Sequence, residues 1–92
     1  MIVSFADKES GRLWQTGKSI RFGQFAPKAV RALQRLEAAV VIEDLRFPSG
    51  NRLEKLHGDR VGQWSIRIDR QWRLCFNWEN GRASDVEIVD YH

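Results

Sequence analysis

The sequence predicts a single α+β domain over residues 1–92, with the element order β-α-α-β-β-β. Apolar residues recur at helical spacing in the first half of the chain, and from Trp64 onward they alternate with polar residues. The turn signals FPSGN and ENGRA divide the second half into short segments. Helices followed by a meander of strands predict two N-terminal helices packed on one face of an antiparallel sheet.

The first seventeen residues should contain one strand and one short helix. Residues 1–5 (MIVSF) are apolar and partly β-branched, which favours a strand. Residues 7–17 suit a helix, because Asp7 can cap its start and Gly17 can end it. The residues that should point inward from this helix are Leu13 and Trp14.

A longer second helix should begin near Pro27, since the first turn of a helix tolerates proline. We expect this helix to run to about Val41, with a further turn that reaches Leu45. One side of it is apolar and should pack in the core through Val30, Leu33, Leu36, Val40 and Ile42.

The strands of the meander should cover about residues 64–68, 72–78 and 84–91. Alternation together with a three-residue loop predicts that Ile68 lies opposite Trp72 on the face that the helices cover. The same register sets Arg67 opposite Arg73 on the other, partly open face. Like charges in that position destabilise a sheet, so a bound polyanion would explain them. The two side chains could instead diverge into solvent or meet carboxylates such as Glu87.

The basic residues are unevenly distributed along the chain. The formal net charge is only +3, yet residues 46–73 hold seven basic and three acidic side chains. Eleven of the fifteen cations are arginine, which suits bidentate contact with phosphate. This distribution points to nucleic acid as a partner, although a solvated basic surface would also explain it.

The number of cysteines and the lengths of the apolar segments indicate the cellular compartment. The lone Cys75 excludes an internal disulfide and favours a reducing environment. No apolar run is long enough to cross a membrane, and no charged-then-apolar leader precedes the domain. We therefore expect a cytoplasmic protein with no membrane partner. Cys75 falls inside a predicted strand, where packing explains it better than nucleophilic chemistry.

The end of the last strand leads into Asp90, Tyr91 and His92, and Tyr91 should share a face with Arg73. The loop before the meander adds His57 and the basic residues Arg52, Lys55 and Arg60. Such a set suits cleavage of RNA by its own 2′-hydroxyl, which needs a proton acceptor, a proton donor and cations around the phosphate. There is no HExxH or CxxC motif, so we expect no metal and no other cofactor.

The segment GNRLEKLHGDRVGQWSIRIDRQWRLCFNW and the ending VEIVDYH resemble the HigB-type toxins of the RelE superfamily. The resemblance covers essentially the whole chain, and its most specific parts are GNRL, GDR, WSIR, QWR and DYH. It implies a RelE-like microbial RNase fold and an endoribonuclease that cuts messenger RNA in the A site of the 70S ribosome. It also implies a HigA-type antitoxin with a helix-turn-helix as the cognate partner.

The same resemblance implies roles for individual residues. Arg73 would lie at the phosphate, with Asp90, Tyr91 and His92 in the active site. Independently of the resemblance, their places on the basic surface lead us to expect that RNA is bound by Arg52, Lys55, Arg60 and Arg67, and that His57 is a further catalytic candidate. Family members often have lysine where this chain has His57, and some have histidine where it has Glu54. Which residue acts as base and which as acid is therefore open.

Two other functions fit the residues without the resemblance. A non-catalytic module that binds RNA or the ribosome would need the basic face but not His92. A protein-interaction domain would use the same basic surface to dock an acidic partner.

Overall fold

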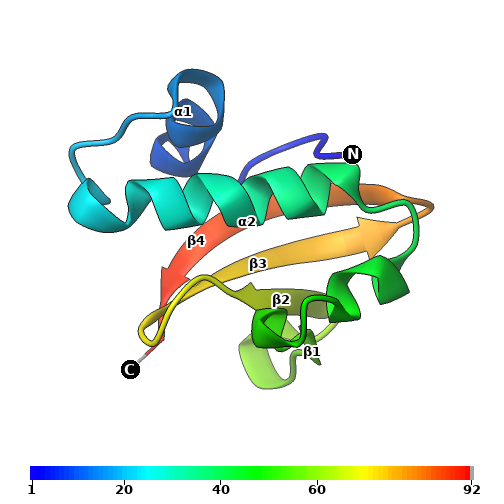
Figure 1. The fold of residues 1–92 in the computed structure, drawn as a ribbon. Coiled ribbons are helices and arrows are strands. Elements are labelled where there is room, and N and C mark those ends of the chain that lie inside the picture. Colours follow the sequence, from blue (N-terminus) through cyan, green and yellow to red (C-terminus); the bar gives the residue numbers. More distant parts are fainter. Residues whose placement is uncertain (92) are drawn as a thin grey trace.

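The computed structural model describes residues 1–91, which form a layer of helices on one face of a four-stranded sheet (Figure 1). The helices are α1 (Lys8–Thr16) and α2 (Ala26–Ala38). The strands lie in the order β1-β2-β3-β4, each antiparallel to its neighbour: β1 (Glu54–Lys55), β2 (Gln63–Arg67), β3 (Trp72–Glu79) and β4 (Arg82–Asp90). The predicted α+β fold, with two N-terminal helices and an antiparallel meander, is confirmed. None of the helices in this part of the chain combines the length and apolar composition needed to cross a membrane.

Local signals set the ends of α1 as predicted. A side-chain oxygen of Asp7 accepts a hydrogen bond from the backbone N–H of Ser10 at 3.2 Å, and Gly17 ends the helix with φ 73°. Leu13 is fully buried, and so is Ser10. The hydroxyl of Ser10 accepts a hydrogen bond from the backbone N–H of Ile88 at 3.1 Å. This bond, which no local pattern predicts, ties α1 to β4.

The helix α2 ends three residues before its predicted boundary. Leu33 and Leu36 are fully buried, as predicted, but Val40 is 74% exposed and does not belong to the core. The helix stops at Ala38, and the carboxylate of Asp44 accepts a hydrogen bond from the backbone N–H of Val40 at 2.8 Å. This contact draws the chain out of the helix, so Val40 leaves the apolar side of α2.

Two short 3₁₀ turns connect α2 with the sheet, at Ile42–Arg46 and Ser49–Asn51. The first contains the predicted further turn, and Leu45 within it is buried. The side chain of Asn51 is also buried, and its Nδ2 donates to the carbonyls of Leu45 and Phe47, both at 3.2 Å. Asn51 therefore fixes the course of this connection.

The strand predicted for residues 1–5 is not regular, and that prediction was wrong. The segment makes only isolated parallel bridges to β4, through Ile2 and Phe5. The ladder between β3 and β4 shifts register where Asp85 adopts φ 50°, which forms a bulge. The hydroxyl of Ser4 accepts the backbone N–H of Asp85 at 2.9 Å and replaces the missing ladder bond.

The register between β2 and β3 is the predicted one, with Arg67 opposite Arg73. The helix-covered face of the sheet is buried through Ile66, Leu74 and Ile88, among others. The sequence did not predict β1, because two residues are too short to show alternation. This strand pairs Glu54 with Ser65 and adds a short edge strand to the sheet beside β2.

Candidate functional site

Arg73 lies on the sheet face away from the helices, and its guanidinium group is held from several sides. Its Nε donates to the hydroxyl of Ser65 at 2.9 Å, and its Nη2 donates to the carbonyl of Arg52 at 2.8 Å. The same Nη2 lies 3.6 Å from the carboxylate of Glu54. Among residues 1–91, nothing accepts a hydrogen bond from Nη1. Arg73 is therefore oriented by the protein and keeps donors for an anion.

Backbone conformation explains how Arg52 takes part in this arrangement. Arg52 has φ 46° at the end of a 3₁₀ turn, where its carbonyl accepts from Arg73. Its own side chain is exposed. From the sequence we predict that this side chain binds RNA. In the structure the main-chain carbonyl of Arg52 also orients Arg73.

Tyr91 lies beside Arg73, with the Cζ atom of Arg73 5.9 Å from the centre of its ring. Tyr91 is 40% exposed, and the thiol of Cys75 is among the groups that influence its hydroxyl. Burial and then Cys75 raise the pKa of Tyr91 above its ordinary value of 10.0, although Arg60 and Arg73 oppose the shift. The phenol is therefore protonated at neutral pH, so it can donate a proton but is a poor base.

Cys75 is fully buried next to Tyr91. Burial raises the pKa of its thiol, so little thiolate forms at neutral pH. This agrees with the prediction that Cys75 packs rather than attacks a substrate.

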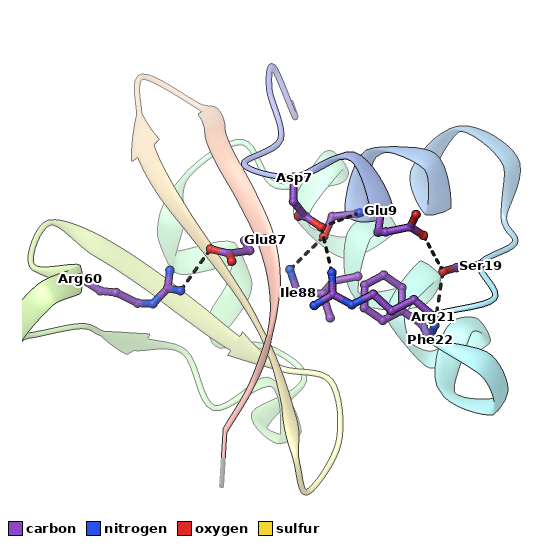
Figure 2. A network of polar contacts seen from close by, with 9 residues as sticks. Asp7, Glu9, Ser19, Arg21, Phe22, Arg60, Glu87 and Ile88 are labelled. Atoms are coloured by element: carbon purple, nitrogen blue, oxygen red, sulfur yellow. Dashed lines mark hydrogen bonds and ion pairs between the residues drawn. The ribbon is translucent and has the colours of Figure 1, made fainter.

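Arg60 and Glu87 complete the cluster with an ion pair of 3.1 Å between Nη2 and Oε1. Figure 2 shows the two side chains meeting on the side of β4 that faces away from α1. Arg60 also donates through Nη1 to Oε1 of Gln63 at 3.0 Å. Glu87 thus meets an arginine, as the sequence allowed, but the arginine is Arg60. We call Arg73, Tyr91, Arg60, Glu87, Cys75, Ser65 and Glu54 the Arg73 cluster.

The turn between β2 and β3 holds the strand end that carries Tyr91. The backbone N–H of Tyr91 donates to the carbonyl of Gln71 at 2.6 Å. The side chain of Gln71 donates to a carboxylate oxygen of Asp90 at 3.1 Å. Asp90 is exposed, and this contact places it at the border of the cluster.

Lys55 and Arg67 do not join the Arg73 cluster. The Nζ atom of Lys55 lies 5.6 Å from the centre of the Trp64 ring, on the opposite face of the sheet. Arg67 lies opposite Arg73 in the ladder between β2 and β3, but its Nε donates to the carbonyl of Asp69 at 3.0 Å. The two guanidinium groups therefore diverge, which reduces the repulsion predicted from their pairing.

His57 is exposed and begins the 3₁₀ turn Gly58–Arg60. The preceding residue, Leu56, bonds to Gln63, which lies opposite Asn77. Asn77 is four residues along β3 from Arg73, which corresponds to about 13 Å of extended strand. The structure therefore places the main chain of His57 apart from Arg73.

His92, which the sequence assigns to the site, lies outside the described residues. Within residues 1–91, no three side chains of His, Cys, Asp or Glu gather as a metal ion would require. Sequence reasoning missed Ser65 and the carbonyl of Arg52, which both orient Arg73. Only the pairing of Ser65 with Cys75 in the register could have indicated the first of these contacts.

Sequence comparisons bear on the family of this chain. Residues 3–92 match a family described as the RelE-like toxin of the type II toxin-antitoxin system HigB. The chain is 38% identical over 90 residues to toxin HigB-1 of Vibrio cholerae, covering 96% of this chain and 95% of the relative. It is 33% identical over 96 aligned residues to endoribonuclease HigB of Proteus vulgaris, covering 100% of both chains.

Solved structures bear on the fold. Two YoeB–YefM complexes from Staphylococcus aureus match with TM-scores of 0.61 and 0.63, at 18% and 17% identity. The matches cover 100% of this chain and 95% and 98% of those chains. Together with the family match over residues 3–92, the helices, the sheet and its register confirm the resemblance seen in the sequence. The chain belongs to the RelE-like toxins of HigB type II toxin–antitoxin systems.

Proposed function

We propose that this HigB-type toxin is a ribosome-dependent endoribonuclease that cleaves messenger RNA in the A site and so halts translation. Its targets are then the 70S ribosome and the message, and its compartment is the cytoplasm. The observation that supports this best is the Arg73 cluster. It presents a fixed guanidinium group beside a protonated phenol, on the face that the helices leave open.

Arg73 would hold the non-bridging oxygens of the scissile phosphate. Negative charge grows on these oxygens when the adjacent ribose 2′-oxygen attacks phosphorus, and an oriented cation stabilises that charge. The bond from phosphorus to the 5′ oxygen then breaks. One fragment ends in a 2′,3′-cyclic phosphate and the other begins with a 5′-hydroxyl. In balance, the 2′-hydroxyl loses one proton and the 5′ oxygen gains one.

We assign the proton donor to Tyr91, because its phenol keeps its proton at neutral pH and lies beside Arg73. The proposed proton acceptor is His92, since a neutral imidazole accepts a proton near pH 7. Asp90 would help to hold the strand end through Gln71. His57 has a supporting role in this scheme, because its main chain lies apart from Arg73.

A HigA-type antitoxin with a helix-turn-helix is the proposed partner that keeps the toxin inactive. The solved neighbours support a complex of this kind. Both are structures of YoeB with YefM, and one is described as a heterotetrameric toxin–antitoxin complex.

The function is tested by comparing cleavage of free and ribosome-bound message. In this scheme the ribosome aligns the 2′-oxygen with the phosphate, and such alignment contributes about 10²-fold or more. We expect 5′ ends mapped by primer extension to accumulate that much faster in a reconstituted translation system than on naked RNA. Equal rates on both would contradict ribosome dependence. Binding to ribosomes without any cleavage would favour the non-catalytic module.

Ser65→Ala tests whether the hydroxyl of Ser65 orients Arg73. The substitution removes the acceptor of Arg73 Nε, and a misplacement of about 1 Å can cost on the order of 10²-fold in rate. We expect a lower kcat on ribosome-bound message with little change in KM, because the charge of Arg73 remains. Ser84→Ala, a half-buried serine on β4, is the matched control and should cleave like wild type. A Ser65→Ala protein with wild-type kcat would show that the other contacts suffice.

A further inference from the structure

A second concentration of positive charge lies outside the Arg73 cluster. A surface hollow of about 400 Å³ opens between α2, the β2–β3 turn and Gly50. The cations that line it are Lys28, Arg31, Arg35, Arg67 and Arg70. Among the described residues, Asp69 is the one carboxylate in this lining.

Asp69 does not neutralise these cations by direct pairing. One of its carboxylate oxygens accepts the backbone N–H groups of Gln71 and Trp72, at 2.9 Å and 3.0 Å. No ion pair within residues 1–91 joins it to a cation of the hollow. The Nε atom of Arg35 is buried, and among residues 1–91 it has no hydrogen-bond partner. Burial, and after it the neighbouring Arg31, lower the pKa of Arg35.

This hollow adjoins a second one that reaches the Arg73 cluster. The second hollow has about 530 Å³ and is lined by Lys28, Asp69, Arg70, Gln71 and Tyr91. The two therefore share the residues Lys28, Asp69 and Arg70. In Figure 1 the β2–β3 turn lies next to the end of β4, below the first turns of α2. We call the two hollows together the basic groove.

We propose that the basic groove binds the phosphodiester backbone of the RNA strand that continues from the cleaved bond. This inference rests on the proposed endoribonuclease function. The groove begins at Tyr91, so one RNA strand can occupy both the Arg73 cluster and the groove. Four of its five cations are arginines, whose planar group matches phosphate oxygens. A row of cations that tracks a backbone is the usual way to hold single-stranded nucleic acid without reading its sequence.

RNA explains the groove better than an acidic protein segment does. A protein partner needs no connection between the groove and the phenol of Tyr91, whereas a substrate strand does. The lining also offers few apolar side chains on which a peptide could anchor, with Ile68 as one of them.

The test uses two triple variants that remove the same charges from different places. The groove variant carries Lys28→Gln, Arg31→Gln and Arg70→Gln, all at exposed positions. The control carries Lys8→Gln, Arg12→Gln and Arg82→Gln, which are also exposed and lie outside the groove. Each variant loses one lysine and two arginines, so any difference between them depends on position.

The probe is a fluorescent 2′-O-methyl oligoribonucleotide of about 12 nucleotides, a length suited to a single-strand groove. It lacks the attacking hydroxyl, so binding is measured without cleavage. The logarithm of the binding constant falls with the logarithm of the salt concentration, and on a single strand each phosphate contact adds about 0.7 to the steepness of that slope. Because the groove variant lacks three cations, its slope should be shallower than that of wild type by about 2. Between about 50 and 200 mM salt, wild type should then lose about 20-fold more affinity than the groove variant. The control should keep the wild-type slope.

Equal slopes for the two triple variants would overturn the groove as an RNA site. So would undetectable binding of the probe by wild type at about 50 mM salt. If the groove variant binds RNA normally but no longer binds polyglutamate, the groove belongs to an acidic protein partner instead. Message cleavage is scored separately on ribosomes. Wild type that binds the probe through the groove yet leaves the message intact supports the groove and contradicts the endoribonuclease.

Discussion

Arg73→Ala should abolish growth arrest and leave a folded protein. The substitution removes the guanidinium group that Ser65, Arg52 and Glu54 hold in place, and with it the cation proposed for the phosphate. Loss of one oriented donor at a developing oxyanion typically costs about 10²–10³-fold in rate. Cleavage of ribosome-bound message and growth after induction measure the effect.

Two variants control for charge and for folding. Arg82→Ala removes the same charge from the exposed start of β4 and should arrest growth like wild type. Arg73→Lys keeps the charge but not the fork, so it should recover only part of the rate. Circular dichroism and antitoxin binding check the fold. A fully toxic Arg73→Ala protein would show that the phosphate is held elsewhere.

Tyr91→Phe should slow cleavage by about 10²–10⁴-fold, the usual contribution of a general acid or base. The ring beside Arg73 is retained, and only the hydroxyl is lost. Because the phenol is active in its neutral form and its pKa is raised above 10.0, the donor is present at all pH values below that range. Single-turnover rates of wild type should therefore show no loss attributable to Tyr91 up to about pH 9.

Neighbouring substitutions decide whether Tyr91 is the donor. Cys75→Ala removes the thiol that helps to raise the pKa of Tyr91 but leaves the phenol and its proton, so it should cleave at nearly the wild-type rate. His92→Gln keeps hydrogen-bonding capacity and should be slow because it removes the proposed base. If Tyr91→Phe cleaves normally while His92→Gln is inactive, proton donation belongs to another residue and Tyr91 only packs on Arg73.

The register between β2 and β3 could be predicted because the alternating apolar rows allow only every second pairing, and a three-residue turn selects one of these. That pairing placed Arg67 opposite Arg73, as the structure has it. The bulge at Asp85 could not be predicted, since it depends on Ser4, far away in the sequence. The exit of Val40 from the helix also escaped the pattern, because an apolar residue at helical spacing predicts burial whether or not the helix continues.

The directions of long side chains were the weak point for the site. Arg67 and Lys55 have long flexible stems, and their positions in the strands left open where their charges lie. Ser65 has the pattern of an ordinary polar residue in an alternating strand, yet it is fully buried between β1 and β3 and accepts a hydrogen bond from Arg73. Roles carried by the main chain, such as that of Arg52, leave no mark in the side-chain pattern.

The strand β4 is hydrogen-bonded along both edges, to β3 and to the segment before α1. A further contact, from the backbone N–H of Ile88 to the hydroxyl of Ser10 in α1, spans 78 positions of the chain. A nine-residue helix such as α1 is not stable alone in water, so it depends on that distant strand. Closing so long a loop is entropically costly and is repaid only when the core forms. Helix and strand should therefore appear in one cooperative step, and a half-folded chain has neither a stable α1 nor a place for Tyr91 beside Arg73.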